Sequence, residues 1–194
     1  TLLLGFVLGY SVLTDQSALQ PWVYHYMVLL GFIAAVPWKR AAPVLTANLQ
    51  LSLAAVYIMS GSFKFNAGYF NSTFPWFLEP VPWSGSFSTE TVYALAFLSA
   101  LFEMAVGVAL LTKKFRRQAV IAATLMHVFI LFVLGPLGHN WDSIIWPWNI
   151  VILVMVWILF WGNKTATITT ALQHRLTFGI VTTLFFFLPS LCHF

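Results

Sequence analysis

Two ionisable side chains interrupt long apolar stretches of the sequence, and their types suit proton transfer. Glu103 precedes Lys113 by ten residues, and His127 follows Arg117 by ten. At 1.5 Å per helical residue, each would lie about 15 Å from the same basic turn. A carboxyl group and an imidazole at equal depth can share a proton. The plainer interpretation is a polar pair that fixes the packing of two helices.

Small residues accompany both side chains. Gly107 lies one helical turn from Glu103, and Ala119 and Ala123 lie on the same helix face as His127. Such residues allow two helices to approach closely. We therefore expect the helices that carry Glu103 and His127 to pack through these positions.

Lys64 is a third candidate, and it lies at the end of a different apolar run. It follows Pro43 by 21 residues, which corresponds to about 31 Å of helix. A lysine there can extend its amine to the lipid headgroups. Alternatively, the lysine is held below the aromatic segment that follows and acts as a base. We take Lys64, Glu103 and His127 as the candidate catalytic residues.

Aromatic side chains supply candidate ligand contacts. Trp146-Pro147-Trp148 begins an apolar run, where indole rings favour the headgroup layer. The same rings can instead form a wall for a flat ligand such as a quinone. A quinone is therefore the candidate cofactor, and the candidate cofactor-binding residues are Trp146, Trp148, Asn149 and Tyr69.

The composition indicates that these residues lie in a membrane. Of 194 residues, 60% are hydrophobic and 7% are charged, whereas a soluble domain carries about 25% charged residues. This composition excludes a soluble enzyme and a nucleic-acid-binding domain. The single cysteine, Cys192, excludes a disulfide within the chain, and no metal site is predicted. We expect an all-α integral protein of the bacterial inner membrane, in contact with the lipid bilayer.

Seven apolar runs approach the roughly 20 residues that a spanning helix needs. We expect a polytopic helical bundle, a single transmembrane domain over residues 1–194, with about seven spans of which the first and last are incomplete. The runs are Thr1–Leu13, Trp22–Val36, Pro43–Gly61, Thr91–Thr112, Gln118–Leu137, Ile144–Trp161 and Leu176–Cys192.

The charged residues sort to two sides if these spans alternate in direction. Lys64 and Glu103 are the two exceptions. Because basic loops are retained in the cytoplasm, the basic side is expected to be cytoplasmic and the acidic side external. The basic residues are Lys39, Arg40, Lys113, Lys114, Arg116, Arg117, Lys164 and Arg175, and the acidic residues are Asp15, Glu79, Glu90 and Asp142.

The connection at residues 62–90 is too aromatic to extend into water. We expect it on the external side, as an interfacial or re-entrant element in the membrane. Its aromatic residues are Phe63, Phe65, Tyr69, Phe70, Phe74, Trp76, Phe77, Trp83 and Phe87, and its prolines are Pro75, Pro80 and Pro82.

One stretch of this region resembles a motif of the HTTM family, which includes the membrane part of vitamin K-dependent gamma-carboxylase. The stretch is Tyr57-Ile58-Met59-Ser60-Gly61-Ser62-Phe63-Lys64-Phe65-Asn66, followed by Tyr69. The chain is similar, more distantly, to DoxX- and MauE-like membrane proteins linked to redox work. The resemblance implies that Lys64 stands where the carboxylase carries a lysine proposed to deprotonate vitamin K hydroquinone. This chain has Phe63-Lys64 in place of two adjacent lysines, and Asn66 and Tyr69 in place of acidic residues and a tryptophan.

Two functions are consistent with these observations. The first is a quinone-linked redox or carboxylase-like module with an externally facing site, in which Lys64 is the base and Glu103 and His127 relay protons. The second is a non-catalytic accessory subunit of a larger respiratory or photosynthetic membrane complex, whose partners would be other membrane subunits.

Overall fold

The computed structural model describes residues 42–140 and 145–162, together with seven single residues: Leu3, Phe6, Val7, Tyr10, Thr14, Tyr26 and Leu30. The chain divides into two compact units, one formed by Thr1–Ser52 with Lys164–Phe194 and the other by Leu53–Asn163. In the described ranges every regular element is a helix. The second unit contains nearly all of these elements, and the account below concerns it.

Four long helical segments correspond to four of the seven predicted spans. They are α3 (Ala42–Phe63), α5 (Thr89–Leu111), α6 (Arg116–Leu134) and α7 (Ile145–Val156), which continues as the π-helix η4 (Trp157–Trp161). Each end lies within three residues of its predicted position. The all-helical prediction is confirmed for this part of the chain. The first, second and seventh predicted runs lie outside the described ranges.

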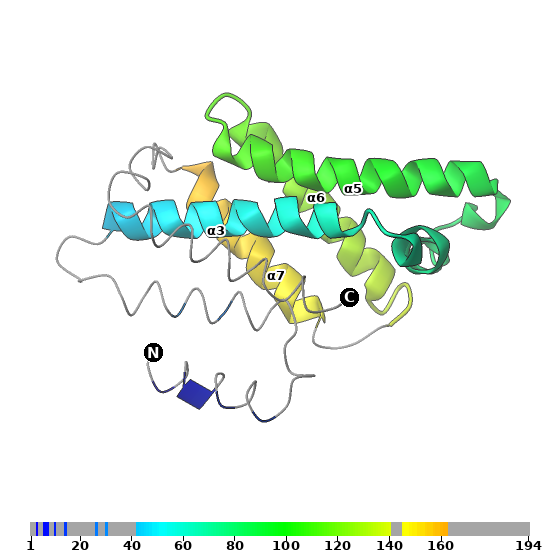
Figure 1. Ribbon diagram of the computed structural model, residues 1–194, viewed down its shortest axis with the longest axis horizontal. Helices are drawn as coiled ribbons and strands as arrows, with labels where there is room; N and C mark the ends of the chain where they lie inside the picture. The colour runs from blue at the N-terminus through cyan, green and yellow to red at the C-terminus, as the bar shows by residue number, and fades with distance from the viewer. Residues whose placement is uncertain are drawn as a thin grey trace. The chain divides into compact units, whose positions relative to one another are not determined.

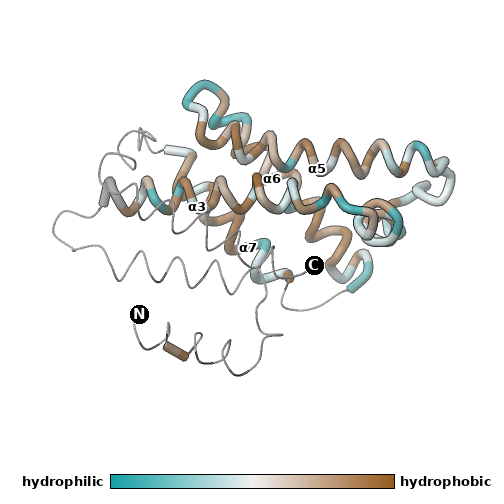
Figure 2. Tube along the Cα trace, viewed as in Figure 1, coloured by the Kyte–Doolittle hydropathy of each residue, from teal (hydrophilic) through white to brown (hydrophobic). Residues whose placement is uncertain are grey.

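Two of the helices, α5 and α6, are long and apolar enough to cross a membrane. Only 33% of the residues in each apolar stretch are buried. Large side chains face outward from both, including Leu98 (57% exposed) and Leu125 (65% exposed). A helix in the core of a soluble protein would cover most of these side chains. In Figure 2, hydrophobic residues predominate along both helices and the turn between them is hydrophilic.

Close backbone contact joins α3 and α5, and two glycines permit it. A Cβ atom added to Gly61 would lie 2.7 Å from the carbonyl oxygen of Ala100, and one added to Gly107 would lie 2.8 Å from that of Ala54. Both approaches are shorter than any ordinary carbon–oxygen contact, so only glycine fits. The residue numbers rise along α3 as they fall along α5, so the two helices are antiparallel (Figure 1).

This contact corrects one prediction. Gly107 was expected to bring α5 against α6, and its closest neighbours are instead Ala54 and Ile58 of α3. Ala119 and Ala123 of α6 are buried as expected. The glycines of α5 and α3 set the approach of those two helices, and this approach determines where α3 ends beside α5.

The aromatic connection folds into short helices alongside the first half of α5. These are the π-helix η2 (Tyr69–Thr73), α4 (Phe74–Leu78) and the 3-10 helix η3 (Ser84–Ser86). Phe74 and Leu78 are buried against Ala96 of α5, and the ring of Phe77 packs edge-on against Phe129 of α6. Figure 1 shows this segment beneath the N-terminal part of α5, beyond the end of α3. The connection therefore covers the region that α3 leaves open.

Capping explains why α5 begins before its predicted start. The side-chain oxygen of Ser88 accepts a hydrogen bond of 3.3 Å from the backbone N–H of Thr91, and Glu90 lies in the first turn. Both features stabilise a helix N-terminus. Counting apolar residues alone misses these polar ones.

Candidate functional site

Lys64 and Glu103, the two exceptions to the charge pattern, form an ion pair with each other. The Lys64 amine contacts Glu103 Oε2. The Glu103 side chain is 9% exposed and the Lys64 side chain 29%. Lys64 therefore does not extend its amine away from the helices, which was one of the two predicted arrangements. Its amine lies against α5 and below the aromatic connection, which was the second predicted arrangement.

The end of α3 brings the two groups together. Gly61 lies against Ala100 and Met104 of α5, which flank Glu103. Lys64 follows Gly61 by three residues, one helical turn, and so reaches the same part of α5. Because α3 ends at Phe63, the lysine stem is not covered by a further turn of α3.

His127 belongs to a hydrogen-bonded chain across three helices. Its Nε2 lies 2.7 Å from Tyr57 Oη of α3, and its Nδ1 lies 2.8 Å from Asn149 Oδ1 of α7. The amide nitrogen of Asn149 donates to the Ile145 carbonyl at 2.8 Å. All three side chains are buried. These hydrogen bonds therefore join α3, α6 and α7.

The Ile145 carbonyl sets the direction of this chain. A carbonyl oxygen only accepts, so the Asn149 amide nitrogen must face it and Oδ1 must face His127. Nδ1 of His127 then donates to Asn149, and in a neutral imidazole Nε2 accepts. The Tyr57 hydroxyl consequently donates to Nε2. In that neutral form, Nε2 of His127 accepts its hydrogen bond from Tyr57.

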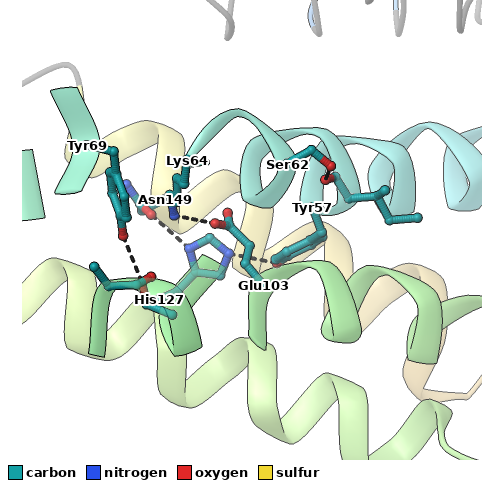
Figure 3. A network of polar contacts seen from close by, with 10 residues as sticks. Tyr57, Ser62, Lys64, Tyr69, Glu103, His127 and Asn149 are labelled. Carbon is teal, nitrogen blue, oxygen red and sulfur yellow. Dashed lines mark hydrogen bonds and ion pairs between the residues drawn. The ribbon is translucent and has the colours of Figure 1, made fainter. Parts of the chain in front are cut away.

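Figure 3 shows the ion pair and the histidine chain in one neighbourhood. Glu103 interacts electrostatically with Tyr57 and with His127. The expected direct partnership of Glu103 and His127 is not what forms. Each hydrogen-bonds to residues of other segments, Lys64 for the carboxylate and Tyr57 and Asn149 for the imidazole.

Tyr69 of η2 covers the ion pair. The Lys64 amine lies 5.7 Å from the centre of the Tyr69 ring, a cation–π distance. The Tyr69 hydroxyl lies 2.8 Å from Ser99 Oγ, and Ser99 donates its own proton to the Ala96 carbonyl at 2.7 Å, so Tyr69 is the donor. Burial raises the pKa of the Tyr69 phenol above its ordinary value, which favours the neutral form of Tyr69.

The Asn66 side chain joins the end of α3 to the start of η2. Its amide nitrogen donates to the Phe63 carbonyl at 2.6 Å, and its Oδ1 accepts from the Tyr69 backbone N–H at 2.9 Å. One side chain thus caps the end of α3 and the start of η2. A carboxylate has no donor for the Phe63 carbonyl, so an amide side chain suits this position.

The candidate cofactor residues on α7 have different positions. Asn149 is part of the histidine chain, whereas the Trp146 ring nitrogen donates to the Leu134 carbonyl at 3.0 Å. That bond attaches the start of α7 to the end of α6. Trp148, half-buried on the first two turns of α7, precedes Asn149 by one residue. A role for either indole in binding a flat ligand remains a prediction.

Tyr57 is the functional candidate that residue type alone did not identify. It is a buried tyrosine on an apolar helix, and such residues are commonly core packing. Its spacing does contain the information, because Tyr57, Gly61 and Lys64 follow at four and three residues and so share one face of α3. That face meets α5 at Gly61 and the polar network at both ends.

No protein-family model, curated protein or solved structure matches the chain. Within residues 42–140 and 145–162, no group of three histidine, cysteine or acidic side chains is placed to hold a metal ion. The functional argument therefore depends on the polar network itself.

Proposed function

We propose that the chain is a polytopic membrane protein whose polar network exchanges protons with a quinone-type headgroup, as part of a quinone-linked redox or carboxylase-like system. The observation that carries this proposal is the Lys64–Glu103 ion pair beside the Tyr57–His127–Asn149 hydrogen bonds, within apolar helices. Ionisable groups at such positions are costly and usually mark a functional site.

The proposed membrane arrangement keeps about seven spans with the basic loops in the cytoplasm. Neighbouring helices α3, α5, α6 and α7 alternate in direction, which supports this arrangement. The α5–α6 turn contains four cations, and the aromatic connection lies at the opposite end of α5. With the cations inside, the ion pair is reached from the external half of the bilayer through the aromatic connection.

The proposed chemistry is transfer of a hydroquinone proton to the carboxylate. Lys64 already carries a proton in the ion pair, so Glu103 is the better acceptor in this arrangement. The hydroquinone O–H bond breaks, its proton binds Glu103, and the electron pair stays on the quinol oxygen. The Lys64 ammonium, released from Glu103, then stabilises that anion. Tyr57 and His127 provide a second donor–acceptor pair at the same site.

The test is binding of a short-chain naphthoquinone and its hydroquinone to the protein in lipid nanodiscs. We expect saturable quenching of tryptophan fluorescence, and under anaerobic conditions a longer-wavelength absorbance of the bound hydroquinone anion. Glu103→Gln should remove the anion absorbance, and Lys64→Met should weaken binding about tenfold or more, since a hydrogen bond to a charged group contributes about 1.5–3 kcal/mol. Lys114→Met, at the other end of α5, is the matched control.

Two outcomes would contradict the proposal. One is the absence of saturable quenching by either ligand. The other is equal binding and equal anion absorbance in the wild type, Glu103→Gln and Lys64→Met. Co-purification with other membrane subunits and without a quinone would favour the accessory-subunit alternative.

A further inference from the structure

The α5–α6 turn and the start of α6 concentrate positive charge. Lys113, Lys114, Arg116 and Arg117 lie within five residues at the start of α6. The positive end of the helix dipole adds to their mutual repulsion. The carboxylates in the described ranges lie elsewhere: Glu103 is paired with Lys64, Glu90 begins α5 at its other end, and Glu79 follows α4.

The two arginines of this turn are held differently. Arg116 is buried, with its Nε donating to the Leu110 carbonyl at 3.0 Å and its guanidinium 5.8 Å from the Phe160 ring. It therefore closes the end of α5. Arg117 is exposed, and its guanidinium lies 5.9 Å from the Trp161 ring.

Two tryptophan rings of η4, Trp157 and Trp161, lie next to each other beside Arg117. Trp161 packs against Trp157 with ring centres 4.5 Å apart, and the Trp157 ring nitrogen donates to Thr124 Oγ1 of α6 at 3.0 Å. A guanidinium lying against a ring keeps its N–H groups in its own plane, where they suit an oxyanion such as a phosphate. The Trp161 ring thus lies beside the Arg117 guanidinium at 5.9 Å, and Arg117 is exposed at the surface.

An exposed apolar surface continues from this cation along α6. Arg117, Ile121, Leu125 and Val128 follow at four, four and three residues, so they share one helix face. The last three are large exposed apolar side chains, and Trp157 and Ile158 of η4 are exposed as well. Because η4 packs against α6, cation, indoles and apolar face form one continuous surface. A ligand that fits has an anionic head and a long apolar tail.

We propose that this surface, formed by Lys113, Lys114, Arg117, Trp157 and Trp161 with the exposed face of α6, binds an anionic phospholipid. The lysines and Arg117 hold the phosphate, the indoles lie at the level of the glycerol, and the acyl chains follow Ile121 and Leu125. Clustered basic residues at the cytoplasmic end of membrane helices attract anionic lipids. This site is separate from the Lys64–Glu103 network.

The test compares ligands by their effect on thermal unfolding of the detergent-purified chain. Phosphatidylglycerol is expected to raise the Tm saturably, whereas phosphatidylcholine and inorganic phosphate are not. Arg117→Gln should weaken the phosphatidylglycerol effect about fivefold, as expected for one cation at a lipid surface, and Trp161→Leu should also weaken it. Trp83→Leu is the matched control for loss of an exposed indole, and the double variant Lys39→Gln/Arg40→Gln is the control for loss of positive charge.

Each alternative outcome overturns the proposal. Equal stabilisation by phosphatidylcholine would indicate a general lipid effect. Equal stabilisation by inorganic phosphate would indicate a free-anion site. Equal weakening by Lys39→Gln/Arg40→Gln would indicate overall charge rather than this surface. If Arg117→Gln lowers the Tm without lipid, native mass spectrometry replaces the Tm as the measurement of bound phosphatidylglycerol. Undiminished retention of this lipid by Arg117→Gln would contradict the site.

Discussion

Lys64 and Glu103 share one ion pair, so their substitutions should not be independent. Glu103→Met or Lys64→Met leaves the partner charge among apolar helices. Because Lys64 is partly exposed, we expect each single variant to lose roughly 2–3 kcal/mol of unfolding free energy. The double variant Lys64→Met/Glu103→Met should recover most of that loss. Unfolding by dodecyl sulfate in mixed micelles measures all four chains, and a double-variant loss equal to the sum of the single losses would exclude coupling.

His127 should be neutral with its proton on Nδ1. The Ile145 carbonyl orients the Asn149 amide, and the amide oxygen then requires a donor from the ring. Nitrogen NMR of the protein labelled at histidine, with His127→Gln used for assignment, distinguishes the two ring nitrogens. A protonated Nε2 would contradict the predicted direction of the chain, because Tyr57 could not then donate.

At the scale of the helices, Gly61 and Gly107 set the separation of α3 and α5. Added Cβ atoms would lie 2.6 Å from Met104 Cγ and 2.7 Å from Ile58 Cγ1 respectively, with backbone atoms nearly as close. Gly61→Ala and Gly107→Ala should each cost about 1–3 kcal/mol through overpacking.

Gly85→Ala is the matched control for these two glycines, because a Cβ atom there has nothing within 4 Å. The same detergent titration measures all three variants. Unfolding curves of Gly61→Ala and Gly107→Ala that coincide with that of Gly85→Ala would show that α3 and α5 do not approach as closely as described. Gly61→Ala should also weaken quinone binding, because it displaces Lys64 from Glu103.

The positions of the helices could be predicted from the sequence, and their ends less well. Apolar runs located α3, α5, α6 and α7 because a long apolar segment can satisfy its backbone polar groups within a helix. The start of α5 depends on the Ser88 cap, which is a polar contact. The short helices of residues 69–78 could not be located, because they depend on burial of Phe74 and Leu78 against Ala96.

The members of the polar network were easier to predict than their pairing. Lys64, Glu103 and His127 are identifiable because a charge in an apolar run is unusual. That Glu103 binds Lys64 depends on where α3 ends beside α5, which Gly61 determines. Counting residues along each predicted helix placed Glu103 at the same depth as His127, and Lys64 at the end of its own helix. This count assumes that α3 and α5 end at the same level.

For the whole molecule, the end of α3 opposite the middle of α5 has a functional consequence. The aromatic connection occupies the space beyond α3, with Tyr69 over Lys64 and His139 stacked on Trp76 at 4.0 Å between ring centres. The stacked histidine also hydrogen-bonds to the Trp76 carbonyl at 2.8 Å. A ligand that approaches the ion pair from the side of this connection must therefore displace it or pass it.

His139→Ala should loosen the connection without touching the ion pair. It removes both the stacking and the hydrogen bond to Trp76, so residues 74–78 should exchange their amide hydrogens faster, by about fivefold for a loss near 1 kcal/mol. Exchange in α6 around His127 should be unchanged. Hydrogen-exchange mass spectrometry in nanodiscs measures both segments, and unchanged exchange at 74–78 would show that this contact does not hold the connection in place.

The proposed topology places the two ends of α5 on opposite sides of the bilayer. In a Cys192→Ser background, Gly85→Cys marks the aromatic connection and Lys114→Cys marks the α5–α6 turn, both at exposed positions. A membrane-impermeant maleimide added to intact cells should label Gly85→Cys, whereas Lys114→Cys should require lysis, because cations are retained inside. Labelling of both from the same side would contradict a spanning α5. It would also contradict both proposals, because the quinone site at Glu103 and the phospholipid site at Arg117 each assume that α5 spans the bilayer.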